Sequence, residues 1–453
     1  MMGNRMAHTP IGLDPGKWVV AAMLFASTAL VSGQAQISPR DQLVFTPYHQ
    51  TGIYDIGEKA GWTVTRTADT TCLHYSYTVK ENNFLLVKSG DLDLTSGTAT
   101  IEVQLNEPAM ILVNINAECA LPPSAAADVA REDKPTEILK PTLLGAAIAP
   151  QLLKPSEETP SDFDAFWKAN LEKLAKIPIN PQLTPMTTEK PGIEMYTVKL
   201  NSVDSHVQGY LAKPSRPGKY PAMILYQYAG VYKLNPDNAA HYAQQGWLTF
   251  NVDSHDMLPS DDSGASKDYA SINNDDRDKS YFLDMFLRDT RAVDFIASLP
   301  EWDGKNIALT GSSMGGWQSL VTAGLNPSRI TAIAVNVPAG ADMNGSLHGR
   351  KTGYPNWKMD DANVVKTSPY FDPVNFAPRI KAATLVAMGF IDTTSPPAGV
   401  WSLYNQITAP KAVVPLVNAG HDNFSPPEKF LPYQQRATEM FNQILEGQPI
   451  SFE

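Results

Sequence analysis

A serine in a glycine-bounded turn is the feature of this sequence best suited to chemistry. The stretch Gly311-Ser312-Ser313-Met314-Gly315 has the Gly-x-Ser-x-Gly spacing of a nucleophile elbow, in which a tight strand-to-helix turn lifts the serine hydroxyl above the edge of a sheet. The two glycines suit a place where backbones pass so closely that a Cβ would clash. The first N–H of the following helix, from Met314, is placed to stabilise an oxyanion. Ser313 is the predicted nucleophile.

A serine needs a base, and chain order selects it. In this kind of fold the acid and then the histidine follow the serine, and without such partners the pentapeptide would mark only a turn in a Rossmann-like sheet. Of the eight histidines, only His348 and His421 follow Ser313. His421 comes directly after a predicted strand at 412–417, whereas His348 lies in a polar loop before the candidate acid. We therefore predict His421 as the base.

The acid is expected at the end of a strand between the serine and the histidine. A predicted strand at 383–388 is followed by Gly-Phe-Ile-Asp, which places Asp392 at its carboxyl end. Asp342 follows the strand after the elbow and is the alternative. In acyl transfer His421 would take the proton of the serine Oγ, and Asp392 would hold the imidazole in the required tautomer.

A second oxyanion donor is expected from the loop 226–230, with the N–H of Tyr228 as the candidate.

Alternating strands and helices surround these residues. Buried strands at 222–226, 247–252, 307–309 and 330–335 alternate with helical stretches such as 281–298, a pattern typical of a mostly parallel, doubly wound sheet. We predict an α/β fold of the α/β-hydrolase type over residues 161–453, with the candidate side chains gathered at the carboxyl edge of the sheet.

The chain before this domain has three predicted parts. Residues 1–35 have the basic start, apolar run and small-residue cleavage site of a signal peptide, with an uncleaved anchor as the alternative. Residues 36–117 alternate apolar and polar positions between turns, which predicts a small immunoglobulin-like β-sandwich. Residues 118–160 are rich in proline and are predicted to be a linker or an arm.

Two features of the predicted sandwich have open interpretations. Its aromatic residues Trp62, Tyr75 and Tyr77 could form a sugar-stacking platform, but aromatic side chains at strand spacing more often fill a core. The two cysteines of the chain, Cys72 and Cys119, could pair in an oxidising compartment or remain two buried thiols.

Composition excludes several classes of partner. The net charge is −11 and no basic run occurs, which argues against nucleic acid or an anionic membrane as partner. Two cysteines cannot make a zinc site of the usual kind, and we expect no metal or cofactor. With the signal peptide removed, the protein is expected to be secreted or periplasmic.

From about residue 162 onward the sequence resembles the acetyl xylan esterase and cephalosporin C deacetylase family, carbohydrate esterase family 7. The matching stretches are Asp162-Phe-Asp-Ala-Phe-Trp167, Arg288-Asp-Thr-Arg-Ala-Val-Asp-Phe295, Leu299-Pro-Glu-Trp-Asp303, Gly311–Gly316, Ser368-Pro-Tyr-Phe-Asp372, Gly389-Phe-Ile-Asp-Thr-Thr-Ser-Pro-Pro397 and Gly420-His421. The resemblance implies the same catalytic residues, an oxyanion donor at Tyr228 and a homo-oligomer.

The sequence departs from the family around the expected pocket. An Arg-Gly-Gln motif of the family is replaced by Asp253-Ser-His255, and the residue before the two prolines is Ser395 where the family commonly has cysteine. His255 is a possible substrate contact or a brace for a loop.

The resulting hypothesis is a secreted serine esterase that removes acetyl groups from polysaccharide or oligosaccharide. The alternatives are another exported α/β-hydrolase, such as a glucuronoyl esterase or a prolyl-oligopeptidase-like peptidase, and a carbohydrate-binding protein with an inactive hydrolase domain.

Overall fold

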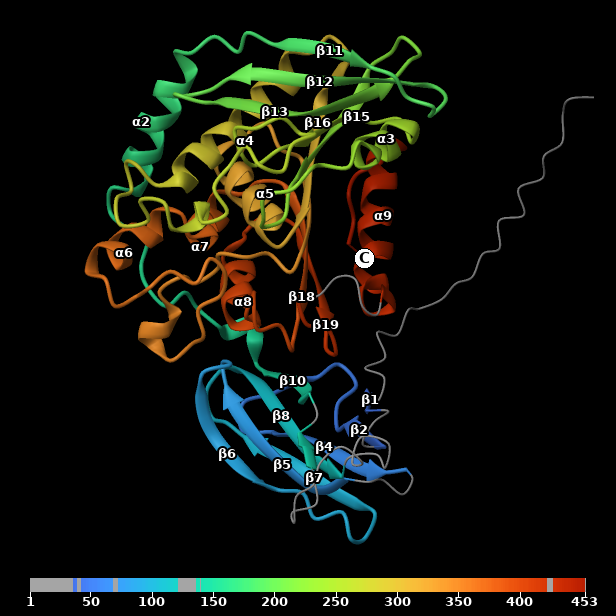
Figure 1. Cartoon of the computed structure of the whole chain (residues 1–453), viewed down its shortest axis with the longest axis vertical. Coiled ribbons are helices and arrows are strands. Elements are labelled where there is room, and N and C mark those ends of the chain that lie inside the picture. Colours follow the sequence, from blue (N-terminus) through green and yellow to red (C-terminus); the bar gives the residue numbers. More distant parts are fainter. Residues whose placement is uncertain are drawn as a thin grey trace, which may run out of the picture.

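The computed structural model describes residues 36–38, 42–67, 72–120, 136–138, 140–421 and 427–452. It consists of a small β-sandwich, drawn in blue, beneath a larger domain of helices and strands (Figure 1). The predicted signal peptide at residues 1–35 lies outside the described residues.

Two sheets form the N-terminal sandwich, as predicted for this region. The first sheet has the antiparallel order β1 (Gln36–Ser38), β2 (Leu43–Pro47), β4 (Lys59–Arg66) and β7 (Thr98–Gln104). The second sheet has the order β3 (Ile53–Tyr54), β10 (Thr142–Ile148), β8 (Ala109–Ala120), β5 (Cys72–Glu81) and β6 (Leu85–Asp91), and β9 (Thr136–Ile138) pairs with β8.

The aromatic residues of the sandwich belong to its core. Trp62, Tyr75 and Tyr77 are all buried, because alternate side chains of β4 and β5 point between the two sheets. The predicted alternative of a sugar-stacking platform from these three rings is therefore wrong. Their burial supplies much of the apolar contact that holds the sheets together.

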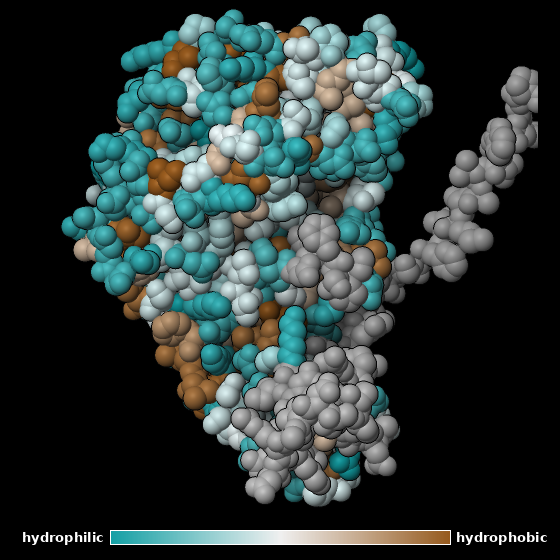
Figure 2. All heavy atoms as spheres, viewed as in Figure 1, coloured by the Kyte–Doolittle hydropathy of each residue, from teal (hydrophilic) through white to brown (hydrophobic). Residues whose placement is uncertain are grey.

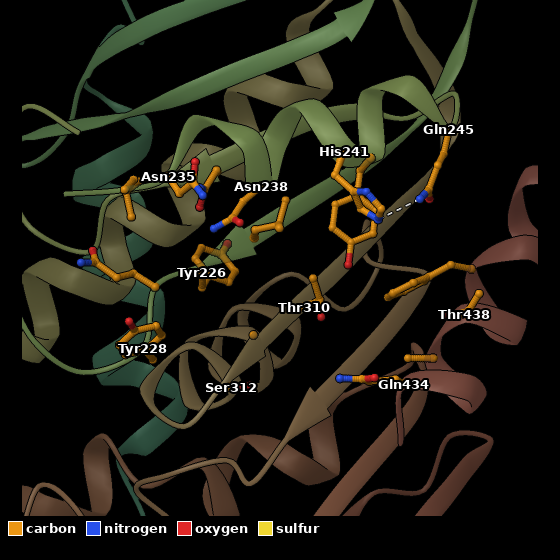
Figure 3. Close-up of a pocket in the computed structure, with 18 of the residues that line it drawn as sticks. Tyr226, Tyr228, Asn235, Asn238, His241, Gln245, Thr310, Ser312, Gln434 and Thr438 are labelled. Atoms are coloured by element: carbon orange, nitrogen blue, oxygen red, sulfur yellow. Dashed lines mark hydrogen bonds between the residues drawn. The ribbon is translucent and has the colours of Figure 1, made fainter. Parts of the chain in front are cut away.

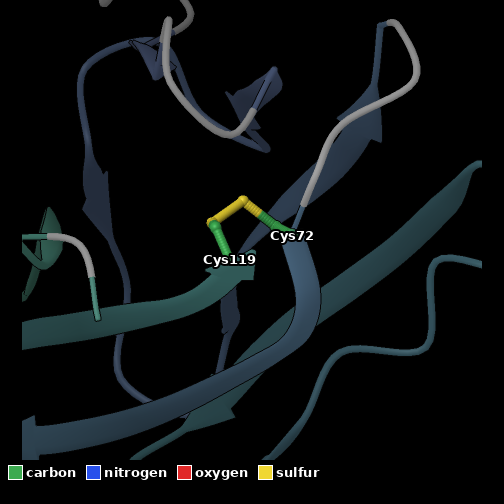
Figure 4. The surroundings of a disulfide bond; sticks show 2 residues. All are labelled: Cys72 and Cys119. Atoms are coloured by element: carbon green, nitrogen blue, oxygen red, sulfur yellow. A yellow bond between two sulfur atoms is a disulfide. The ribbon is translucent and has the colours of Figure 1, made fainter. Parts of the chain in front are cut away.

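The two cysteines are joined in a disulfide (Figure 4). Cys72 and Cys119 are paired across the neighbouring antiparallel strands β5 and β8. The structure thereby selects the first of the two interpretations left open by the sequence, and the bond links the two longest strands of the sandwich.

The predicted linker at residues 118–160 is shorter than expected. β8 extends to Ala120, and β10 pairs with β8 along its full length from Thr142 to Ile148. The sequence of β10, Thr-Leu-Leu-Gly-Ala-Ala-Ile, is an apolar strand whose flanking prolines mark its ends and do not indicate an extended arm. Only the residues between Ile148 and the first helix of the larger domain form the connection.

The larger domain is built on a nine-stranded mixed sheet. The order is β11 (Gln182–Met186), β12 (Ile193–Asn201), β13 (His206–Pro214), β15 (Leu248–Val252), β14 (Tyr220–Tyr226), β16 (Trp302–Ser312), β17 (Ala332–Asn336), β18 (Ala383–Gly389) and β19 (Lys411–Leu416). The strands from β15 to β19 in this order are parallel, and β11, β12 and β13 add antiparallel strands at one edge. This is the predicted α/β-hydrolase arrangement.

Helices cover both faces of this sheet (Figure 1). The helices are α2 (Phe163–Ala175), α3 (Pro236–Gln244), α4 (Tyr281–Ser298), α5 (Met314–Leu325), α6 (Ala362–Thr367), α7 (Pro373–Phe376), α8 (Pro397–Gln406) and α9 (Leu431–Leu445). Short 3₁₀ turns occur at Pro150–Leu152, Tyr269–Ser271, Gly345–His348, Ser368–Tyr370, Ala377–Arg379 and Pro427–Phe430.

Successive residues of each central strand pack against opposite helix layers. Ile224 and Leu309 belong to the core shared with α4, α5 and α8, whereas their neighbours Met223 and Ala308 belong to the core shared with α9. Because both faces are buried, these strands have continuous apolar sequences instead of alternating ones. The sheet is therefore a rigid platform whose carboxyl edge carries the candidate site.

Candidate active site

The turn at Ser313 has the geometry of a nucleophile elbow. β16 ends at Ser312 and α5 begins at Met314, and Ser313 between them has φ +54° and ψ −119°. A Cβ on Gly311 would lie 2.5 Å from the carbonyl carbon of Gly315, so strand and helix approach too closely for any side chain. The serine side chain is held between these two rigid elements.

Three side chains from distant parts of the chain form one hydrogen-bonded series. Ser313 Oγ lies 2.8 Å from Nε2 of His421, and Nδ1 of His421 lies 2.8 Å from Oδ2 of Asp392. A carboxylate only accepts hydrogen bonds, so Nδ1 carries a proton and donates a hydrogen bond to Asp392. Nε2 is then free to accept the hydroxyl proton of Ser313, which is the arrangement that general-base activation requires.

The orientation of Asp392 is set by its own loop. The residue is completely buried, and its Oδ1 accepts backbone N–H bonds from Thr394 and Ser395 at 2.8 and 2.7 Å. One oxygen is therefore engaged by the backbone and the other is presented to His421. A carboxylate restrained in this way keeps the imidazole in one tautomer and one orientation.

The alternative acid Asp342 and the other histidine after Ser313, His348, lie elsewhere. Asp342 Oδ2 pairs with Arg350 at 2.9 Å, and the Ser156 side chain also donates to it. His348 pairs with Glu157 at 3.3 Å. Both residues thus tie the connection after the sandwich to the larger domain, and the structure does not bring them to Ser313.

The two predicted oxyanion donors belong to the start of α5 and to the loop packed against it. Met314 is the first residue of α5, so its N–H precedes the hydrogen bonds within the helix and remains available. The loop of Tyr228 abuts the same helix start, because a Cβ on Gly315 would lie 2.4 Å from the carbonyl oxygen of Tyr226. The ring of Tyr228 is exposed and stacks on that of Tyr232, with centroids 4.5 Å apart. Any role of Tyr228 as an oxyanion donor would therefore fall to its backbone N–H.

His255 braces this loop and does not reach a substrate, which corrects the predicted substrate contact. Its ring is fully buried, with Nε2 3.1 Å from the carbonyl oxygen of Gly230 and Nδ1 2.7 Å from the hydroxyl of Tyr281. The carbonyl can only accept, so Nε2 donates and Nδ1 accepts the Tyr281 proton. Burial lowers the pKa of His255 to about 4, so the ring is neutral at physiological pH.

Gln318 is a functional residue that the sequence did not indicate. Its side-chain Nε2 donates to the carbonyl oxygen of Gln227 at 2.9 Å, and its Oε1 accepts from the Ser254 hydroxyl at 2.9 Å. Gln318 thus fastens the Tyr228 loop to the helix that carries the elbow. No local pattern could have revealed this, because Gln227 lies 91 residues earlier in the chain.

A cavity of about 610 Å³ lies behind the elbow, between α3 and α9 (Figure 3). Its polar lining includes Asn235, Asn238, His241 and Gln434, and Ser312 borders it. Among the described residues, neither Ser313 nor His421 lines the cavity. The cavity therefore borders the elbow, but the catalytic hydroxyl is not part of its lining.

The described residues contain neither a candidate metal cluster nor a helix that could span a membrane. No group of three or more metal-binding side chains was found in that part of the chain. Nor does any helix there have the length and apolar character needed to cross a membrane.

A parallel sheet with a serine at the elbow, followed by an acid and a histidine that meet it, defines the α/β-hydrolase class of proteins. Residues 151–437 match the acetyl xylan esterase (AXE1) family. The match covers more than half of the chain, and the protein belongs to this family, a family of carboxylic ester hydrolases.

Known relatives agree with this assignment. Acetyl esterase Axe7A of Xylanibacter ruminicola is 37% identical over 282 residues, which cover 58% of this chain and 64% of that relative. The acetyl xylan esterase of Paenibacillus sp. R4 has a similar structure, with a TM-score of 0.56, 26% identity and coverage of 64% of this chain and 97% of that chain. Acetyl xylan esterase 1 of Thermoanaerobacterium sp. shows the same fold, with a TM-score of 0.52, 21% identity and coverage of 62% and 95%.

Proposed function

We propose that this protein is an exported serine esterase that removes acetyl groups from polysaccharides or oligosaccharides such as acetylated xylan. The observation that carries the proposal is the series Ser313–His421–Asp392, with both hydrogen bonds at 2.8 Å. The acetylated substrate is suggested by the names of the family and of the relatives described above.

The proposed mechanism has two halves. In the first, Nε2 of His421 takes the hydroxyl proton as Ser313 Oγ attacks the acetyl carbonyl carbon, and the imidazolium then protonates the departing sugar oxygen. This leaves an acetyl group on Ser313. In the second half, His421 deprotonates a water molecule that attacks the acetyl carbonyl, and acetate leaves as the proton returns to Ser313.

Both halves pass through a tetrahedral oxyanion that must be stabilised. The backbone N–H groups of Met314 and Tyr228 are the proposed donors, because they belong to the helix start and to the loop packed against it. Donors fixed before the reaction stabilise the developing charge without reorganising. Asp392 stabilises the imidazolium that forms in each half.

The disulfide supports the proposed export. Disulfides persist in oxidising compartments and are rare in the cytosol, and Cys72 and Cys119 are paired here. We propose that the protein is secreted or periplasmic after removal of residues 1–35. N-terminal sequencing of the exported protein tests this, with a new terminus near residue 36 expected and retention of the original terminus contradicting it.

A substrate comparison tests the reaction. Acetate release from acetylated xylan should exceed the release of methanol from a methyl glucuronate ester and the cleavage of a peptide amide by orders of magnitude. A preference for the glucuronate ester or the peptide would replace the proposal by one of the other exported hydrolases. Absence of hydrolysis on all three would favour a binding protein with an inactive hydrolase domain.

A further inference from the structure

The β5–β6 hairpin of the sandwich reaches the acid of the catalytic series. Asn83, in the turn of this hairpin, donates its side-chain Nδ2 to the backbone carbonyl oxygen of Asp392 at 2.9 Å. Asn83 is buried, with only 6% of the residue exposed. We propose that Asn83 is a positioning residue that orients Asp392, and that the sandwich is thereby part of the active site. This inference rests on the proposed function.

The conformation of the turn directs Asn82 toward the sandwich and Asn83 toward the larger domain. Asn82 and Asn83 have φ +50° and +58°, and the N–H of Phe84 closes the turn on the carbonyl of Glu81 at 2.9 Å. Asparagine and glycine are the residues that tolerate this backbone. Asn82 Oδ1 accepts the N–H of Met110 at 2.9 Å, so Asn82 anchors the turn to the sandwich while Asn83 contacts Asp392.

Close backbone contacts fix where the hairpin lies. A Cβ on Gly145 of β10 would lie 2.6 Å from Cβ and 2.9 Å from the carbonyl oxygen of Phe390. A Cβ on Gly52 would lie 2.9 Å from Cγ1 of Val417. Phe390 precedes Asp392 by two residues and Val417 precedes His421 by four. The sandwich therefore packs against both loops that carry the acid and the base.

The surface of the larger domain also meets the hairpin. The N–H of Lys351 donates to the carbonyl oxygen of Asn82 at 3.0 Å, and a Cβ on Gly349 would lie 3.3 Å from Cδ1 of Leu85. Figure 2 shows hydrophobic residues near the junction of the two domains. Met110 and Ala147 of the sandwich are buried in the same core as Phe390 and Val417. The two domains thus share one core instead of being joined by a loose tether.

The hydrogen bond from Asn83 restrains the backbone carbonyl of Asp392, and the backbone after this carbonyl orients the Asp392 carboxylate. Oδ1 of Asp392 is held by the N–H groups of Thr394 and Ser395, which follow the carbonyl that Asn83 binds. Rotation of that carbonyl would move both N–H groups and turn Oδ2 away from His421. The sandwich lies outside the residues 151–437 that match the family, so this support is an addition to the family's hydrolase domain.

Glycine substitutions separate positioning from folding. Asn83→Gly removes the donor to Asp392 and creates Asn-Gly, a sequence strongly preferred in tight hairpin turns. The matched control Asn82→Gly removes the neighbouring amide, whose hydrogen bonds to Met110 and Glu81 lie within the sandwich. With 4-nitrophenyl acetate as substrate, we expect Asn83→Gly to lower kcat about tenfold or more with KM within about twofold, and Asn82→Gly to leave kcat near the wild-type value.

A second readout does not depend on an ester substrate. A fluorophosphonate probe labels a serine at a rate set by its activation, and Asn83→Gly should lower this rate by about the same factor as kcat. The melting temperature of both variants should be similar. If Asn83→Gly does not fold, Asn83→Asp keeps a residue that tolerates the turn and replaces the donor by an acceptor, and the same loss of kcat is expected.

The outcomes distinguish the inference from the proposed function. Equal kcat and equal labelling for the two glycine variants would overturn the positioning role of Asn83 while leaving the esterase proposal intact. If kcat falls only because Asn83→Gly is partly unfolded, as a lowered melting temperature would show, the positioning role is also overturned. If the wild-type protein hydrolyses no ester and the probe does not label Ser313, the proposed function itself fails.

Discussion

Gln318 donates its side-chain amide to the backbone carbonyl oxygen of Gln227 across 2.9 Å. This bond joins the first turns of α5, which begins one residue after Ser313, to the loop that carries Tyr228. Gln318 is completely buried, so water cannot replace the bond. The distance between the two proposed oxyanion donors, Met314 and Tyr228, therefore depends on a residue that contacts no substrate.

Loss of this bond should reduce catalysis more than binding. In Gln318→Leu the carbonyl of Gln227 loses its donor and the Tyr228 loop can shift away from the oxyanion. We expect kcat to fall by at most the about 100- to 1000-fold that loss of an oxyanion donor causes, and by about 10-fold or more, with little change in KM. Steady-state kinetics on a small acetyl ester measure this. Ser319→Ala is the control, because its hydroxyl bonds only to Gly315 within the same helix; equal kcat for the two variants would contradict the prediction.

Removal of the nucleophile should abolish turnover without unfolding the protein. Ser313→Ala keeps a side chain of similar size in the same strained turn, so we expect a melting temperature close to that of the wild type. We expect kcat to fall by about 10⁴-fold or more, with a residual rate from the remaining site. Acetate release and thermal unfolding are measured on the same preparation. Wild-type turnover by this variant would refute the assignment of Ser313.

The buried His255 should make stability depend on acidity. Its pKa is lowered to about 4 by burial, from an ordinary value of 6.5. Between these values the unfolded chain binds a proton that the folded chain does not, so the unfolding free energy decreases as pH falls from 6.5 to 4. Above pH 6.5 the contribution of the neutral His255 to stability is fully present. The decrease is on the order of 3 kcal/mol.

Comparison with a variant isolates this effect. His255→Phe lacks the titrating group and should be less stable at every pH, because the Gly230 carbonyl and the Tyr281 hydroxyl each lose their hydrogen bond to the imidazole. Its stability should nevertheless depend less on pH between 4.5 and 7. The neighbouring Asp253, whose pKa burial raises to about 7, has an effect of opposite sign that is common to both proteins. Parallel pH profiles from denaturant unfolding would show that His255 does not titrate as expected.

The disulfide should stabilise the sandwich. Cys72 and Cys119 are 47 residues apart, and a cross-link closing a loop of that length contributes about 4 kcal/mol in the chain-entropy account. Thermal unfolding with and without a reductant should show a lower transition for the sandwich when the bond is reduced. The double variant Cys72→Ala, Cys119→Ala is the control, since the chain has only these two cysteines. A reductant effect in that control would point to another cause.

Local sequence patterns predicted the features that depend on residues close together in the chain. The glycines around Ser313 indicate a turn with closely approaching backbones, and continuous apolar runs such as 383–388 indicate strands buried on both faces. Chain order then selected His421 and Asp392 from many histidines and acids. The fold class and family predicted from these features are confirmed.

Two predictions are wrong where the outcome depends on contacts with residues that are distant in the sequence. The prolines that flank β10 predict a linker, yet the strand pairs with β8 and belongs to the sheet. The position of His255 along the chain suggests a substrate contact, but the packing of Tyr269 and Tyr281 encloses its ring. Neither burial nor pairing can be deduced from one strand or one loop alone.

The sequence by itself determined the alternation of strands and helices, the elbow and the order of the three candidate catalytic residues, because spacing and hydrophobic pattern act over a few residues. The tertiary structure alone decided that Asn83 meets Asp392, 309 residues away, and that Gln318 meets Gln227. Such hydrogen bonds form only when folding has removed both partners from water and brought their backbones together. No pattern of neighbouring residues contains that information.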